Sequence, residues 1–239
     1  MAMGVCGGWW RSAPRTPTAG WETGPVSAWT RPGGTAWPVV LREGGLVLRP
    51  LRRRDARRWR SVRQLNAAWL APWEATHPGE DGPPPTFAQM VRRFSREARA
   101  GRMLPFAVEL DGELVGQVTV SGITWGSLCS ASAGYWVDQR VAGRGVIPTA
   151  LAMAVDHCFA VGLHRVEVSI RPENAASLRV AHKLGFRHEG RRLAFLHIDG
   201  AWRDHETFAL TVEEVPDGVL ARWRAGERYL PPDSSATHR

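Results

Sequence analysis

The residues best suited to chemistry lie between Arg140 and Gly145. Two glycines, Gly143 and Gly145, flank an arginine directly before an apolar helical pattern that includes residues 150–155. A helix N-terminus presents unpaired backbone N–H groups and the positive end of the helix dipole, which together favour a phosphate-bearing ligand. Glycines let these amides approach the ligand closely. The loop therefore predicts a pyrophosphate cradle, and the alternative is a plain strand-to-helix turn.

Two better-known phosphate loops do not fit this stretch. A Walker loop needs four residues between its glycines and then Gly-Lys-Ser/Thr, which are absent here. A Rossmann fingerprint needs a third glycine where Pro148 stands, and the expected acidic residue about 20 positions further on is not evident. Pro148 lies in the first helical turn, where its missing N–H costs the helix little. The interpretation that remains is a short loop that binds a pyrophosphate.

The elements around the loop predict a βαβα arrangement. Residues 134–137 and 165–170 have the composition of strands, and a short helix is expected after Asn174, ending in the run Lys183-Leu184-Gly185-Phe186. Elsewhere we expect strands at 46–50, 104–110, 114–121, 193–198 and 202–212, with Asp-Gly turns at 111–112 and 199–200. Asp55, Thr86 and Asp217 are the expected caps of three further helices.

Composition limits the domain organisation and the class of protein. Residues 1–38 lack periodicity and predict a disordered leader or a start site assigned too far upstream, residues 39–225 a single domain, and residues 226–239 a flexible tail. No stretch approaches the ~18 apolar residues that a membrane helix needs, so no membrane association is expected. The three cysteines are scattered, which argues for a reducing, cytoplasmic location without a cysteine-based zinc site.

The charge is strongly basic. The formal net charge is +8, and Lys183 is the only lysine. Such a charge suits an anionic partner, such as a nucleotide cofactor or an RNA-rich assembly, but an arginine-biased genome explains it equally well. Seven arginines crowd into residues 52–63. We interpret them as the solvated face of an amphipathic helix, because no zinc spacing, zipper or helix-turn-helix accompanies them, and no direct DNA binding is expected.

The central stretch resembles the core of the GNAT acetyltransferase superfamily. That family's loop reads Gln/Arg-x-x-Gly-x-Gly/Ala, and residues 140–145 fit every fixed position. The resemblance extends to the RimJ/RimL branch, which acetylates N-terminal amines of ribosomal proteins. Its motifs are matched by residues 70–74, by Gly134-Tyr135, by Asn174-x-x-Ser177 with Leu184-Gly185-Phe186, and by residues 198–205, so that the likeness covers roughly 44–212.

The resemblance implies a fold and a cofactor. The fold is α+β in α/β/α layers, with a mixed, mostly antiparallel, seven-stranded twisted sheet that is splayed at its central strands and flanked by helices. The cofactor is acetyl-CoA, with its thioester between strands that end near Val137 and Ile170. No metal is expected. The implied cofactor-binding residues are Trp136, Val137, Asp138, Arg140, Ala142, Gly143, Arg144, Gly145, Val146, Ile147, Thr149, Asn174 and Ser177.

The resemblance also implies roles for individual residues. Backbone N–H groups of residues 136–138 would polarise the thioester carbonyl. The tyrosine that many members use as an acid is replaced by Ala181, so Ser177 is the expected donor to the departing thiolate. Glu74 is the first candidate to receive the acceptor's proton or bind its charge, and His197 is the second. An α-amine needs little help, since about a tenth of it is neutral at pH 7.

The implied function is transfer of acetyl to the N-terminal α-amine of a protein, plausibly a ribosomal protein, by direct attack in a ternary complex. Two alternatives stay open at this point. One is an acetyltransferase for small amines such as aminoglycosides, because function lives in the site rather than in the fold. The other is a non-catalytic module that binds acyl-CoA. A pure nucleic-acid binder is a more distant reading, and the sequence does not decide the oligomeric state.

Overall fold

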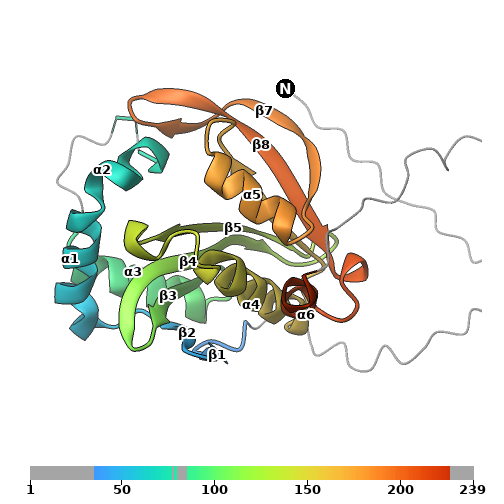
Figure 1. Cartoon of the computed structure of the whole chain (residues 1–239), viewed down its shortest axis with the longest axis horizontal. Coiled ribbons are helices and arrows are strands. Elements are labelled where there is room, and N and C mark those ends of the chain that lie inside the picture. The colour runs from blue at the N-terminus through green and yellow to red at the C-terminus, as the bar shows by residue number, and fades with distance from the viewer. Residues whose placement is uncertain (1–34, 77, 80–84, 227–239) are drawn as a thin grey trace, which may run out of the picture.

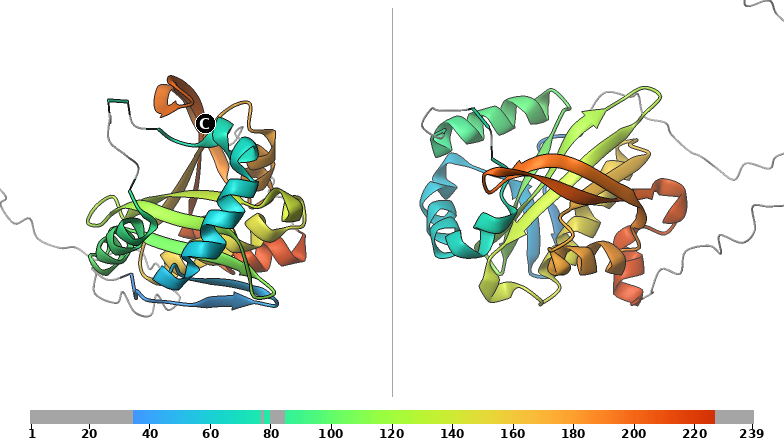
Figure 2. Two further views of the ribbon diagram at one scale, coloured as in Figure 1. Left: turned by 90° about the vertical axis from the view of Figure 1, so that its left-hand side faces the viewer. Right: turned by 90° about the horizontal axis from the view of Figure 1, so that it is seen from above.

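The computed structural model describes residues 35–76, 78–79 and 85–226, which form one sheet with helices on both of its faces (Figures 1 and 2). The eight strands lie in the order β1-β2-β3-β4-β5-β6-β8-β7. Their bounds are β1 (Leu41–Glu43), β2 (Leu46–Pro50), β3 (Leu104–Leu110), β4 (Glu113–Thr124), β5 (Ser130–Val137), β6 (Arg165–Ile170), β7 (Arg187–Ile198) and β8 (Ala201–Thr211). Only β5 and β6 pair in parallel, so the predicted mixed, mostly antiparallel sheet is confirmed.

The sheet has one strand more than the seven predicted. The additional strand is β1, which pairs antiparallel with β2 at one edge of the sheet. Three residues are too few to show the alternation by which a strand is recognised in a sequence. The chain also packs on the fold before Val39. Thr35 is buried and its hydroxyl donates to the Ala98 carbonyl oxygen at 3.3 Å, so residues 35–38 are not part of a detached leader. The rest of the expected leader lies outside the described residues.

The helices form the two outer layers. They are α1 (Ala56–Leu65), α2 (Ala67–Leu70), α3 (Phe87–Arg99), α4 (Val146–Ala160), α5 (Ala175–Lys183) and α6 (Val219–Ala225), with 3₁₀ turns η1 (Arg53–Asp55), η2 (Ala71–Trp73), η3 (Gln139–Val141) and η4 (Val212–Glu214). In β3, Phe106 and Val108 pack in the cluster that contains α4, whereas Ala107 packs in the cluster of α1 and α3. This alternation shows that both faces of the sheet are covered. None of the helices in the described ranges has the length and apolar character that a bilayer-spanning segment requires.

The central strands separate along their length. β5 pairs with β6 only through Ser130, Ala131 and Ser132, although β5 continues beside β4 as far as Val137. The last residues of β6 pair with β8 on the opposite side. A gap therefore opens between the ends of β5 and β6, as the sequence predicted.

The helix caps agree with the sequence in one case out of three. Thr86 caps α3, and its hydroxyl accepts the Gln89 N–H. Asp55 stands at the N-cap position of α1, but its carboxylate is bound by the Arg49 guanidinium and by the Arg52 N–H instead. Asp217 was predicted to cap the last helix, and this is wrong because the chain places a distant carboxylate there.

That distant carboxylate belongs to Asp156 of α4. It accepts the N–H groups of Val219 at 2.7 Å and Leu220 at 3.0 Å. These N–H groups lie in the first turn of α6 and would otherwise lack an acceptor. The cap fixes α6 against α4, and Trp223 of α6 then reaches the start of α4, where its indole N–H donates to the Thr149 hydroxyl at 2.9 Å.

Candidate active site

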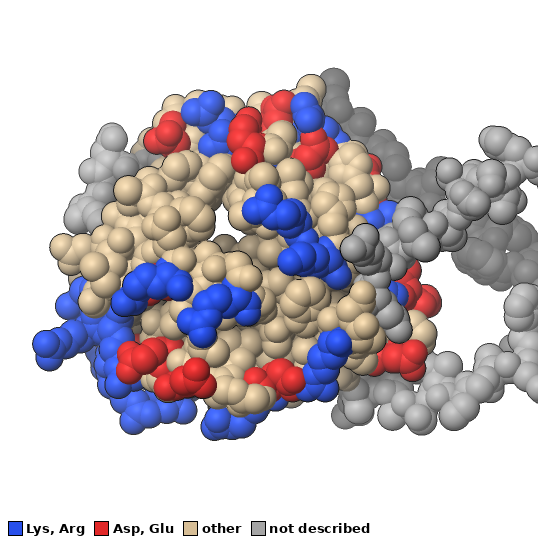
Figure 3. Space-filling model, viewed as in Figure 1, with Lys and Arg blue, Asp and Glu red and all other residues tan. Residues whose placement is uncertain are grey.

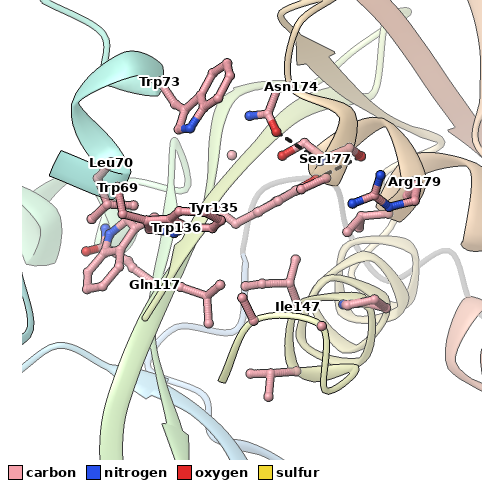
Figure 4. Close-up of a pocket in the computed structure, with 18 of the residues that line it drawn as sticks. Trp69, Leu70, Trp73, Gln117, Tyr135, Trp136, Ile147, Asn174, Ser177 and Arg179 are labelled. Atoms are coloured by element: carbon pink, nitrogen blue, oxygen red, sulfur yellow. Dashed lines mark hydrogen bonds between the residues drawn. The ribbon is translucent and has the colours of Figure 1, made fainter. Parts of the chain in front are cut away.

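A cavity of about 580 Å³ lies where the central strands separate. Its walls come from α1, α2 and η2 on one side and from α5 on the other, with β4, β5 and the glycine loop between them. Figure 4 shows Trp69, Leu70 and Trp73 on the first wall and Asn174, Ser177 and Arg179 on the second. The lining brings together segments that are more than 100 residues apart in the sequence, so it could not be read from any single motif.

The glycine loop has the geometry of a phosphate cradle. Gly143 and Gly145 have φ of +79° and +81°, a region that other L-residues rarely adopt. Gly145 is the N-cap of α4, and the first intrahelical bond runs from the Thr149 N–H to its carbonyl oxygen. In the part of the chain that the structure describes, no acceptor meets the N–H groups of four loop and helix residues, namely Gly143, Gly145, Val146 and Ile147.

These four amides fit a pyrophosphate, because they are unpaired and lie at the positive end of the α4 dipole. Pro148 is the third residue of α4 and has no N–H, so one donor is missing from the first turn, as the sequence indicated. The helix loses nothing by it, since that N–H would have no intrahelical partner either.

The predicted cofactor-binding residues fall into two groups. Those that line the cavity are Trp136, Val137, Ala142, Gly143, Gly145, Val146, Ile147, Asn174 and Ser177. Asp138, Arg140, Arg144 and Thr149 do not. Asp138 is 1% exposed and binds the Arg140 guanidinium at 2.5 Å, and this pairing lowers the pKa of the Asp138 carboxyl. The Thr149 hydroxyl is occupied by the Gly145 carbonyl oxygen and the Trp223 indole.

Two cations that the sequence analysis missed face the cradle from α5. Arg179 and Lys183 lie one turn apart and both line the cavity. Their i, i+4 spacing places them on one face of the helix, which is the pattern that could have revealed them. Figure 3 shows basic side chains on the surface around this opening. Together with the four free amides, they supply the positive charge that a phosphate-bearing cofactor needs.

One backbone amide of β5 points into the gap. The Asp138 N–H, which we expected to polarise the carbonyl, donates to the Val115 carbonyl oxygen at 2.7 Å and is therefore not available. In an antiparallel ladder, hydrogen-bonded and non-hydrogen-bonded residues alternate. Val137 pairs with Gly116 in the next position and so directs its N–H away from β4, toward the separated end of β6. Of the three expected donors, Val137 has the suitable orientation.

A third residue that was missed is Tyr135 of β5. Its hydroxyl donates to the Ser177 carbonyl oxygen at 3.5 Å, across the gap between β5 and α5 (Figure 4). Burial raises the pKa of Tyr135 to about 12, so the phenol keeps its proton. The sequence analysis used Tyr135 only as part of a motif. Ser177 also lines the cavity, and its N–H donates to the Asn174 side-chain oxygen at 3.0 Å, which caps α5.

The two candidate acid–base residues of the acceptor side are placed differently. Glu74 lines the cavity and forms an ion pair with Arg63, another lining residue. The Arg63 guanidinium lies 5.6 Å from the Trp59 ring and 5.1 Å from the Trp136 ring, so cation–π contacts hold it in place.

His197 does not line the cavity. Its Nδ1 atom lies 2.6 Å from the Thr76 hydroxyl, and its carbonyl oxygen accepts the Thr76 N–H at 2.8 Å. The imidazole also packs edge-on against Trp202, with ring centroids 5.6 Å apart. His197 therefore ties the segment after η2 to the β7–β8 hairpin, and a direct role as base does not follow from its position.

Fold and site together define an acyl-CoA-binding transferase, and the comparisons with known proteins agree. The family model described as acetyltransferase (GNAT) domain matches residues 45–187. The chain belongs to the GNAT acetyltransferase family and is an acetyl-CoA-dependent N-acetyltransferase. RimJ of Mycobacterium smegmatis, solved in complex with CoA-disulfide, is 44% identical with a TM-score of 0.74, and the match covers 80% of this chain and 96% of that one.

Two curated N-acetyltransferases are also similar to this chain in sequence. The ribosomal protein uS5-alanine N-acetyltransferase of Escherichia coli (strain K12) is 29% identical over 184 residues, which are 75% of this chain and 94% of that protein. The probable N-acetyltransferase YjcK of Bacillus subtilis (strain 168) is 37% identical over 101 residues, 42% of this chain, so the match spans 56% of that relative's length. The chain is thus close to the ribosomal-protein N-acetyltransferases, as the sequence indicated.

Proposed function

We propose that the enzyme acetylates the N-terminal α-amine of a protein, and that this protein is a ribosomal one. The observation that carries the proposal is the Arg63–Glu74 ion pair in the acceptor wall of the cavity. A protein N-terminus presents an ammonium group and, three bonds away, a carbonyl oxygen. Glu74 can accept from the ammonium while Arg63 donates to the carbonyl. A simple amine offers the first of these groups without the second. The ribosomal acceptor is supported by the names of the relatives, which are statements about those proteins.

In this proposal each side chain has one task. Acetyl-CoA supplies the activated acetyl group as a thioester when it is bound. The free amides of the glycine loop, with Arg179 and Lys183, hold phosphate groups. The Val137 N–H, directed into the gap, stabilises negative charge that develops on the carbonyl oxygen. The Tyr135 hydroxyl, which faces Ser177 across the gap, would donate a hydrogen bond to the departing thiolate.

The acceptor requires no strong base. An α-amino group has an ordinary pKa near 8, so about a tenth of it is neutral at pH 7, whereas a lysine side chain near 10.4 is neutral in well under about one per cent. The Glu74 carboxylate is already paired with the Arg63 guanidinium. Glu74 therefore acts by binding the acceptor's charge, and solvent removes the proton.

The test is thiol release from acetyl-CoA with a panel of acceptors. The panel holds peptides that begin with Ala, Ser, Thr or Met, a peptide with a blocked N-terminus and one lysine, and an aminoglycoside. We expect kcat/KM to be highest for one of the free N-termini. A higher value for the blocked lysine peptide or the aminoglycoside would overturn the proposal while leaving the family assignment intact.

A further inference from the structure

Within residues 52–60, at the start of α1, the structure exposes arginines but no carboxylate. Residues 52–60 carry six exposed arginines, which are Arg52, Arg53, Arg54, Arg57, Arg58 and Arg60. Within the described ranges, none of the six has an ion-pair partner. The one carboxylate of this segment, Asp55, is buried and bound by Arg49. We call this set the α1 arginine patch.

At the other end of the sheet, acids accompany many of the arginines. Six arginines around β6, β7 and α6 each have a glutamate partner, as in the pairs Arg171–Glu173, Arg191–Glu206 and Arg192–Glu167. An arginine-biased composition would enrich both regions in arginine, but it does not explain why acids accompany arginines in one region and are missing from the other. The positive charge of the α1 arginine patch is therefore available to an anionic partner outside the described chain.

The patch extends onto neighbouring elements. Arg92, Arg93 and Arg99 of α3 are also exposed, and α3 packs beside α1 with the Trp59 and Phe87 rings 5.4 Å apart. On the other flank, Arg42 of β1 lines a surface hollow of about 480 Å³ together with Arg52, Arg54 and Arg58. Two carboxylates, Asp55 and Glu109, also line this hollow, and both are bound by Arg49. Figure 3, in the same view as Figure 1, shows basic side chains crowded along the edge that α1 forms.

The chemistry of the patch favours a phosphate backbone over a protein. Every cation in it is an arginine, whose planar guanidinium binds phosphate with two parallel hydrogen bonds. Protein interfaces usually depend on apolar or aromatic anchors. No large apolar side chain in residues 52–60 is exposed, and the exposed ones near this segment are single residues, Leu65 at the end of α1 and Val40 beside the arginine-lined hollow.

The α1 arginine patch lies next to the wall of the cavity that is proposed to bind the acceptor. Arg63, one turn beyond Arg60 on α1, already belongs to the acceptor wall of the cavity. We propose that the α1 arginine patch binds the phosphate backbone of RNA, so that an acceptor carried on an RNA–protein particle is presented to the adjacent opening. The binding itself does not rest on the proposed acceptor, and it is tested separately from acetylation.

The experiment measures fluorescence anisotropy of a labelled single-stranded RNA against the full chain at salt concentrations from about 0.05 to 0.2 M. If the six arginines each neutralise one phosphate, log K should fall with log salt with a slope of about −4. The triple variant R57Q/R58Q/R60Q should reduce this slope to about −2 and weaken binding on the order of tenfold or more. Its thermal unfolding midpoint should match the wild type, because glutamine suits exposed helix positions.

The matched control is R191Q/R192Q/R224Q, which removes the same net charge from exposed arginines that have glutamate partners. It should retain wild-type RNA affinity and salt slope. An equal loss of RNA affinity in both triple variants would show that only the overall charge matters. It would overturn the assignment of RNA binding to the α1 arginine patch. Binding of poly-glutamate as tight as that of RNA would overturn the choice of a phosphate backbone in favour of an acidic protein.

Discussion

The Tyr135 hydroxyl and the Ser177 carbonyl oxygen are 3.5 Å apart across the gap between β5 and α5. A contact of this length is weak, so the hydroxyl can turn to a ligand in the cavity. Because burial raises the pKa of Tyr135 to about 12, the phenol stays protonated at the pH of any ordinary assay. A coenzyme A thiol has a much lower ordinary pKa, near 8.5 for thiols, so under the proposed function the phenol would assist the departing thiolate as a hydrogen-bond donor and not as an acid.

Tyr135→Phe should therefore lower kcat by about a hundredfold with little change in the KM for acetyl-CoA. Steady-state thiol release measures both constants. Ser177→Ala is the matched comparison, because it removes the other hydroxyl near this point and should have the smaller effect. If kcat of Tyr135→Phe equals that of the wild type while Ser177→Ala loses activity, the donor is Ser177, as the sequence analysis expected.

Gly145→Ala should weaken cofactor binding more than it weakens the fold. The φ of +81° strains any residue with a Cβ, and the added Cβ would lie 3.6 Å from the Trp223 ring. We expect the KM for acetyl-CoA to rise about tenfold, because the loop amides would shift, and the free energy of unfolding to fall by about 1 kcal/mol. Gly126 has the same φ of +81° far from the cavity lining, so Gly126→Ala should show the stability loss without the change in KM.

The sequence was sufficient wherever the information is local. The bounds of β2, β3 and β6 were predicted to the residue, and the glycine loop, the cap at Thr86 and the short helix after Asn174 follow from short-range patterns. Turns, caps and strand alternation depend on neighbours only a few positions away. The splayed sheet was predicted because the loop motif resembles a family whose fold is known.

The predictions from the sequence were wrong or incomplete where two residues in contact are far apart in the chain. The Tyr135 hydroxyl meets Ser177 42 residues later, and Asp156 caps α6 63 residues further on. Arg63 and Glu74 are closer, but their pairing depends on how α1 and η2 are folded against β5. Such contacts are set by the packing of whole elements, and no local pattern encodes them. Asp217 was chosen as the cap of α6 because it is the nearest suitable residue, and proximity in sequence was misleading.

Asp156→Ala should lower the free energy of unfolding by about 1–2 kcal/mol, since two first-turn N–H groups of α6 lose their acceptor. Thermal or denaturant unfolding measures this loss. Asp217→Ala is the control and should be nearly neutral. A loss at Asp217 equal to that at Asp156 would contradict the capping arrangement in the structure.

The Arg49–Asp55 pair should make stability depend on pH in the acid range. Burial alone would raise the pKa of Asp55, but hydrogen bonds from Arg49 and the Arg52 N–H outweigh it, and the pKa is lowered. A carboxyl whose pKa is lower in the folded state stabilises the fold above its unfolded pKa of about 3.9, and this contribution is lost as the pH falls through the folded value.

Asp55→Asn should therefore be about 3 kcal/mol less stable than the wild type at pH 7, because it leaves the buried Arg49 with one carboxylate fewer. The difference should stay constant down to about pH 5 and shrink below about pH 4. Urea unfolding at a series of pH values gives both curves. Asp199→Asn makes the same chemical change in an exposed turn and should show no such convergence, and a pH-independent difference for Asp55→Asn would contradict the assignment.

Glu74→Gln distinguishes charge binding from base catalysis. Glu74 is 46% exposed at its side chain and is paired with Arg63, whose guanidinium is confined between two tryptophan rings. If Glu74 binds the acceptor's ammonium, the neutral amide should raise the KM for an N-terminal peptide about tenfold and leave kcat and its pH profile nearly unchanged. A base would instead show a large loss of kcat and the loss of the acidic limb of that profile.

Glu173→Gln is the control for the Glu74 prediction, because Glu173 also lines the cavity and is likewise paired with an arginine, Arg171. It removes one carboxylate from the α5 wall and leaves the Arg63–Glu74 pair in place. We expect it to change the KM for the peptide less than Glu74→Gln does. An unchanged kcat/KM in Glu74→Gln would remove Glu74 from the site, and the acceptor's charge would then have to be held elsewhere in the cavity, with Glu173 as the next carboxylate to test.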